Sequence, residues 1–189
     1  MSALATMKSI SSLFFRLELR RGPFFLNFTD LHQSNLLVDK EWNIKCLIDL
    51  EWSCSRPVEM MHPPYWLTNQ AVDGIDQNEY EKLHGEFMEV FKEEERKSCP
   101  QARISLSQIL EQGWQIGTSW YSLALDSPTG IFTLFYEHIQ PRFEKKHIDD
   151  PAFFTIMQSY WCTNAANFIR TKVQDKATYD ERLRAEFEN

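Results

Sequence analysis

Residues 24–52 of the chain read FFLNFTDLHQSNLLVDKEWNIKCLIDLEW. An aromatic run opens this stretch, and two apolar runs follow it, each preceded by a polar segment with turn character. Such a pattern predicts short strands separated by turns. We expect residues 36–38 to pair antiparallel with the strand around residues 46–48, across a turn at residues 40–43. The stretch therefore predicts a small β-hairpin near the N-terminus.

Three polar residues, Asp30, Asn35 and Asp49, flank this hairpin. Four residues separate Asp30 from Asn35, and thirteen separate Asn35 from Asp49. A hairpin brings its outer ends together, so Asn35 and Asp49 should lie at one open end. Phosphoryl transfer needs a carboxylate that orients the attacking hydroxyl, and an amide oxygen with a second carboxylate that hold Mg²⁺. This order of residues is typical of the catalytic half of a kinase-like phosphotransferase. Taken alone, Asp30 and Asn35 also fit a plain turn and helix cap.

The segment TDLHQSNLLVD, followed by LIDLEW, resembles the aminoglycoside phosphotransferase and choline-kinase-like family, particularly its fungal branch. The wider similarity runs from RRGPFF through EWSCSRPVEMMHPPYWLTNQAVD to DKATYDERLRAEFE and covers most of the chain. The resemblance implies a protein-kinase-like fold and an ATP- and Mg²⁺-dependent transfer of phosphate to a small-molecule hydroxyl. It assigns Asp30 as the catalytic base, and Asn35 and Asp49 as the residues that hold Mg²⁺ and its nucleotide. Glu51 matches a supporting acidic position.

The chain departs from the family pattern at two places. Phe28 stands where the family usually has a histidine, two residues before the catalytic aspartate. Only 29 residues precede Asp30, and they contain one lysine, Lys8, and no glycine-rich loop. The similarity therefore implies the C-terminal lobe of the fold with the N-terminal lobe absent. Two hypotheses follow: a truncated phosphotransferase, or a non-catalytic, pseudokinase-like binding or interaction module.

The remainder of the sequence predicts helices, which makes the chain mainly α with a small β-hairpin (α+β). We expect a single domain over residues 1–189, with the catalytic hairpin at about 24–52 and a helical remainder at 53–189. Prolines in residues 51–64 favour extended or looped chain. Apolar periodicity, caps and breakers predict helices over residues 1–21, 78–97, 104–125 and 131–141, one that begins at Asp150-Pro151 with an apolar face reaching Phe168, and a charged tail helix over residues 175–189.

The composition of the chain excludes several classes of binding partner. The formal net charge of −7 argues against binding to nucleic acid or to anionic membranes. The longest apolar runs are too short for a membrane helix. The four cysteines form no CxxC motif, which favours core or incidental thiols in a reducing compartment and a cytoplasmic location. A small-molecule substrate remains, and Asp73, Asp76 and Glu79 either attract a cationic one or simply begin a helix.

Some residues keep two interpretations. His32 lies inside the Asp30 loop, where it either takes part in proton transfer or, as we favour, stabilises the loop by hydrogen bonds. Tyr65 and Trp66 either line a substrate pocket or anchor a loop. The N-terminal helix either exposes an apolar patch that causes self-association or folds back onto the other helices. The patch would comprise Leu13, Phe14, Phe15 and Leu17.

Overall fold

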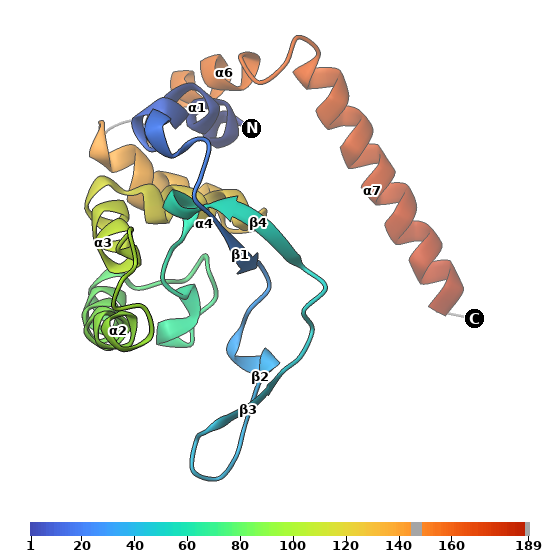
Figure 1. The fold of residues 1–189 in the computed structure, drawn as a ribbon. Helices are drawn as coiled ribbons and strands as arrows, with labels where there is room; N and C mark the ends of the chain where they lie inside the picture. Colours follow the sequence, from blue (N-terminus) through green and yellow to red (C-terminus); the bar gives the residue numbers. More distant parts are fainter. Residues whose placement is uncertain (145–148, 188–189) are drawn as a thin grey trace.

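Helices dominate the computed structural model, which describes residues 1–144 and 149–187 (Figure 1). The α-helices are α1 (Ser2–Ile10), α2 (Gln77–Ser98), α3 (Leu106–Ile116), α4 (Thr118–Asp126), α5 (Ile131–Leu134), α6 (Pro151–Ser159) and α7 (Ala165–Phe187). The strands are β1 (Phe24–Phe28), β2 (Leu36–Val38), β3 (Ile44–Leu47) and β4 (Ser53–Pro57). The prediction of a mainly α chain with a small β component is confirmed.

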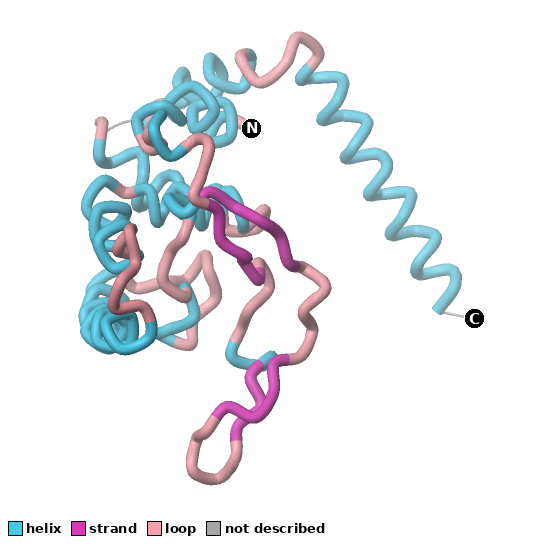
Figure 2. The backbone as a smooth tube through the Cα atoms, in the orientation of Figure 1, coloured by secondary structure: helices cyan, strands magenta, loops and turns pink. Residues whose placement is uncertain are grey.

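The strands form two antiparallel ribbons. β1 pairs with β4, with Leu26 opposite Ser55, and β2 pairs with β3, with Leu37 opposite Cys46. The second ribbon is the predicted hairpin, and it carries a bulge between Leu37 and Val38. The first ribbon uses a segment for which the prolines had predicted extended or looped chain. Figure 2 shows the β2–β3 ribbon projecting away from the helices, beyond the β1–β4 ribbon.

The core lies where the N-terminal segment meets α4, α5 and the turn that follows α5. Met7, Phe135 and Ile139 are fully buried there. Phe14 stacks on Tyr121 with ring centroids 4.6 Å apart. The Thr118 hydroxyl donates to the Phe14 carbonyl oxygen at 2.8 Å. These contacts fasten the first part of the chain onto the helices that come late in the sequence.

The prediction of one helix over residues 1–21 is wrong. α1 ends at Ile10, and two 3₁₀ turns follow, at Ser11–Leu13 and Leu17–Leu19. Serine side chains compete for backbone hydrogen bonds, and the Ser11 hydroxyl donates to the Lys8 carbonyl at the point where the helix stops. The expected apolar patch is divided as a result: Phe14 is buried, whereas Leu13 and Leu17 are 60% and 81% exposed.

The predicted helix over residues 104–125 is two helices, α3 and α4. Gly117 separates them. Its backbone φ is +94°, a value that residues other than glycine adopt only at a cost in free energy. Gly113 meets the expectation of close helix contact, because a Cβ there would lie 3.3 Å from the Ser119 hydroxyl oxygen. One of the two glycines therefore serves packing, and the other turns the chain.

The first of the C-terminal helices, α6, begins as predicted, but the helices divide differently. Asp150 caps α6 by accepting a hydrogen bond from the Ala152 backbone at 2.9 Å. α6 ends at Ser159, so the apolar face expected to reach Phe168 is broken between two helices. α7 starts ten residues before the predicted tail helix, and residues 188–189 of that tail lie outside the described part of the chain.

Candidate functional site

The turn of the β2–β3 hairpin is stabilised by the side-chain carboxylate of Asp39. Asp39 Oδ1 accepts hydrogen bonds from the backbone N–H groups of Glu41 and Asn43, at 3.0 and 2.9 Å, and Asp39 Oδ2 pairs with Lys45 at 2.8 Å. The Lys45 and Asn43 contacts lower the pKa of Asp39 to about 2. Since the turn is fixed, the register at the open end of the hairpin is fixed as well.

Asn35 lies at that open end and connects it to the Asp30 loop. Its side-chain Nδ2 donates to the Asp30 carbonyl oxygen at 3.0 Å, and its own carbonyl accepts from the Ile48 N–H at 3.1 Å. The first bond commits the amide nitrogen to the loop and leaves Oδ1 as the acceptor, to which the Ser34 hydroxyl donates only a long bond of 3.4 Å. The Asn35 backbone therefore lies beside Ile48, the residue that precedes Asp49, and its Oδ1 remains available as an acceptor.

Asp49 has an unusual backbone. Its φ is +61°, in the left-handed region that aspartate adopts more readily than most residues other than glycine, and Trp42 in the hairpin turn has a similar φ of +66°. In the part of the chain that the structure describes, neither Asp49 nor Asp30 engages its carboxylate in a hydrogen bond or ion pair. Glu51 is exposed in the link between β3 and β4.

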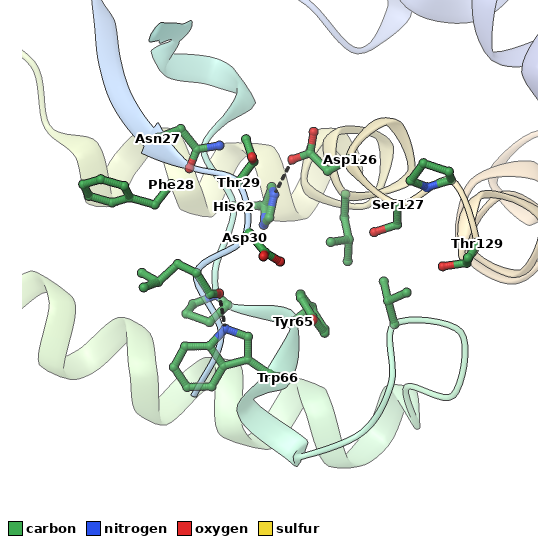
Figure 3. Close-up of a pocket in the computed structure, with 15 residues that line it drawn as sticks. Asn27, Phe28, Thr29, Asp30, His62, Tyr65, Trp66, Asp126, Ser127 and Thr129 are labelled. Carbon is green, nitrogen blue, oxygen red and sulfur yellow. Dashed lines mark hydrogen bonds and ion pairs between the residues drawn. The ribbon is translucent and has the colours of Figure 1, made fainter. Parts of the chain in front are cut away.

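Asp30 itself opens onto a cavity of about 300 Å³ between the ribbons and the helices (Figure 3). The walls come from the end of β1, the segment after β4 and the turn between α4 and α5. Tyr65 lies against the same space, and burial, reinforced by the Asp30 charge, raises its pKa. Asn35, Asp49 and Glu51 do not line this cavity. The polar and aromatic wall residues are Asn27, Phe28, Thr29, Asp30, His62, Tyr65, Trp66, Asp126, Ser127 and Thr129.

A charged cluster that the sequence did not predict supports one wall. Asp126, at the end of α4, accepts from Arg56 of β4 at 2.5 Å and lies 3.2 Å from His62 Nε2. Burial alone would raise the pKa of Asp126, but the hydrogen bonds from His62 and Arg56 outweigh burial and lower it. One signal in the sequence could have indicated this cluster. Asp126 lies at the C-terminus of a helix, where the negative end of the helix dipole is unfavourable for a carboxylate unless a cation lies nearby.

Contacts bear on the two interpretations that the neighbouring residues had kept. Trp66 lines the cavity and also anchors a loop, because its indole N–H donates to the Leu31 carbonyl at 2.8 Å, next to Asp30. Tyr65 lines the cavity. His32 stabilises its own loop, as predicted, because its Nδ1 accepts from the Ser34 N–H at 3.3 Å. Asp76 caps α2 by accepting from the Glu79 N–H at 2.9 Å, which is the helix-start interpretation of this acidic group.

The chain was also compared with known proteins. No family model, no curated protein and no solved structure matches it. Within the described residues, no three or more histidine, cysteine, aspartate or glutamate side chains gather as metal ligands. None of the helices described combines the length and the apolar character that crossing a membrane requires.

Proposed function

We propose that this chain is the C-terminal lobe of an ATP- and Mg²⁺-dependent phosphotransferase of the aminoglycoside phosphotransferase type, which acts on the hydroxyl of a small molecule. One observation carries the proposal: the Asn35 amide donates to the Asp30 carbonyl while the hairpin register pairs the Asn35 backbone with Ile48, the residue before Asp49. The three residues that the chemistry requires are thereby coupled through one hydrogen bond and one hairpin.

Asp30 is the proposed catalytic base. It lies at the cavity in which the acceptor binds, and its carboxylate has no partner among the described residues that would compete for the proton. General-base catalysis of this kind contributes about 10²–10⁴-fold in rate. The Asn35 and Trp66 bonds hold the backbone that directly follows the Asp30 side chain, at the carbonyls of Asp30 and Leu31, so the carboxylate is presented on a loop anchored at two points.

Asn35 and Asp49 are the proposed ligands of Mg²⁺, with Glu51 in support. An amide oxygen and a carboxylate are the hard oxygen donors that this ion prefers, and protein sites for it commonly use few side chains and leave other positions to phosphate and water. When bound, the ion would neutralise charge on the phosphates of ATP. The left-handed backbone of Asp49 and the committed amide nitrogen of Asn35 both fit this role.

The cavity is the proposed acceptor site. Tyr65 supplies an apolar face, and the Ser127 and Thr129 side chains supply hydroxyl groups on the opposite wall. We propose that the acceptor carries a cationic group, which would suit the carboxylate of Asp30. We also place the protein in the cytoplasm, where its four free cysteines, all of them exposed rather than in the core, would stay reduced.

Calorimetric titration of the chain with ATP, with and without Mg²⁺, tests the assignment. We expect Mg²⁺-dependent binding that Asp49→Asn and Asn35→Ala each weaken at least about tenfold, because each removes an oxygen donor from the ion. Asp30→Asn should bind Mg-ATP normally but lose phosphate transfer. The matched control is Asp175→Asn, an exposed carboxylate on α7. Equal Mg-ATP affinity of wild type and Asp49→Asn would show the site to be wrong.

The non-catalytic module remains the second candidate, and Phe28 favours it. This residue replaces the family histidine and is half-buried among the residues that line the cavity. A ligand-binding module would bind a small molecule in the cavity without Mg²⁺. Wild-type chain that takes up no Mg-ATP at millimolar concentration, and an affinity for cavity ligands unchanged by Asp49→Asn, would support this candidate over the enzyme.

A further inference from the structure

Among the residues that the structure describes, the last helix, α7, has no partner of comparable size. None of its 23 residues is buried, and Figure 1 shows it extending away from the other helices. No other helix or strand of the described residues packs extensively against it. It nevertheless carries large apolar side chains: Val173, Leu183 and Phe187 are 65%, 42% and 80% exposed. A long, unsupported helix with an apolar stripe is stable in water mainly when the stripe is covered.

The stripe follows the spacing of a coiled coil. Steps of four and three residues alternate without interruption along one side of the helix, which is the repeat of core positions in a heptad. Apolar residues occupy both ends of this seam, and a charged pair occupies its centre. The seam positions, in order, are Ile169, Val173, Lys176, Asp180, Leu183 and Phe187.

The charged centre determines which orientation of two such helices is acceptable. Lys176 and Asp180 pair within the helix at 2.7 Å. Parallel pairing in register would place each charge opposite its own copy, which is unfavourable. Antiparallel pairing places Lys176 of one copy opposite Asp180 of the second, twice over. In this same register Val173 lies opposite Leu183, and Ile169 opposite Phe187, so every seam position meets a complementary one.

The charged residues that flank the seam form one favourable and one unfavourable kind of pair across the antiparallel interface. In the antiparallel register, Lys172 faces Glu186 of the second copy, which adds an opposite-charge pair on one flank. Arg170 faces Arg184 of the second copy on the other flank, which is the one like-charge juxtaposition. The helix is only about 35 Å long at 1.5 Å per residue, and its centre is polar. The interface is therefore small and its affinity modest.

We propose that α7 is a self-association element, which pairs with α7 of a second copy of this chain as an antiparallel two-helix coiled coil. The occupant of the stripe is a second copy because its own charge pattern and its own apolar pattern are complementary to themselves in a single register. The proposal is independent of the phosphotransferase assignment, since no residue of the candidate site lies on α7.

Sedimentation velocity of the full chain, over about 1–100 μM, tests the proposal. We expect a reversible monomer–dimer equilibrium. Lys176→Asp and Asp180→Lys should each weaken it at least about tenfold, because each places like charges opposite one another at both central contacts. An equimolar mixture of the two variants should restore dimers, since the mixed pair has opposite charges at both contacts. The doubly substituted chain should also dimerise.

The mixture of the two variants distinguishes loss of the intermolecular charge pairs from simple unfolding of α7. Either single substitution also removes the intrahelical pair, and a variant whose helix had simply unfolded would not be rescued by another damaged copy. Leu17→Asp is the matched control: it introduces a charge at an 81% exposed leucine of the N-terminal segment and should leave dimerisation unchanged. A monomer throughout, no rescue in the mixture, association abolished by Leu17→Asp, or a mixture that dimerises more tightly than wild type, as parallel pairing would give, overturns the proposal.

Discussion

The helical body and the β-ribbons of this molecule differ in what their residues are used for. In the body, Met7, Tyr121 and Phe135 are almost completely removed from solvent. On the ribbons, comparably large side chains are open to water: Trp42 is 81% exposed and Ile44 64%. The ribbons nevertheless position the candidate site, because Asp30 and Asp49 follow their strands. Stability is concentrated in the body, and the candidate chemistry lies on the ribbons and at their junction with it.

The largest effect should come from the centre of the body. Phe135→Ala removes a fully buried ring and leaves a cavity, so we expect a loss of about 3–5 kcal/mol in the free energy of unfolding. Trp42→Ala, on the hairpin turn, should change it by less than about 0.5 kcal/mol. Urea unfolding followed by circular dichroism measures both. Similar losses for the two variants would mean that the hairpin packs on something and that the contrast is wrong.

A pH effect of the next size should come from His138. This residue is 8% exposed and stacks on Trp120 with ring centroids 3.9 Å apart, and burial lowers its pKa to about 4. The unfolded chain, with an ordinary histidine pKa near 6.5, binds the proton more readily. Stability is therefore complete above about pH 6.5 and falls by about 3 kcal/mol as the pH approaches 4.

His138→Phe separates this effect from others because it keeps an aromatic ring on Trp120 and removes the titration. Most of the loss between pH 6.5 and 4 should disappear, and the remainder should reflect His84, whose pKa burial also lowers. The measurement is urea unfolding at a series of pH values. An unchanged slope in the variant would place the proton uptake elsewhere.

The junction between body and ribbon should show an intermediate effect. Asp126→Asn leaves the Arg56 guanidinium without its carboxylate, although both side chains are more than four-fifths buried. We expect the free energy of unfolding, measured by urea unfolding, to fall by about 2 kcal/mol at neutral pH. Because the pKa of Asp126 is lowered, its wild-type contribution is present above the ordinary aspartate value and disappears as the pH falls through the folded value, below about pH 4. The exposed Asp175→Asn is the control, and a loss no larger than its own would contradict the prediction.

The smallest effect should be local. Trp66→Phe keeps an aromatic ring but removes the N–H that donates to the Leu31 carbonyl. The free energy of global unfolding should fall by only about 1 kcal/mol. Amide hydrogen exchange should rise in residues 30–35, the loop that carries Asp30, more than in α4. Trp52→Phe, at a 63% exposed tryptophan, is the control. Uniform acceleration across both regions would indicate that Trp66 supports the body rather than the loop.

Local patterns were sufficient for the parts of the fold that depend on neighbouring residues. The hairpin could be predicted because its apolar runs and its turn lie within a few residues of one another, and Asp39 then fixes the turn. The start of α6 could be predicted from Asp150 and the proline after it. The N-terminal helix was predicted too long because apolar periodicity continues past Ser11, while the chain there turns so that Phe14 can stack on Tyr121.

The sequence by itself determined the hairpin and pointed to the chemistry that we propose, because the carboxylates and the amide that phosphate transfer would require lie close to that hairpin and their spacing is readable along the chain. Only the tertiary structure decided which residues surround them. Arg56, His62 and Asp126 are separated by up to 70 residues and meet because β4 and the end of α4 lie at one cavity wall. Contacts between distant segments depend on how the helices pack, and no local pattern of apolar and polar residues encodes that packing.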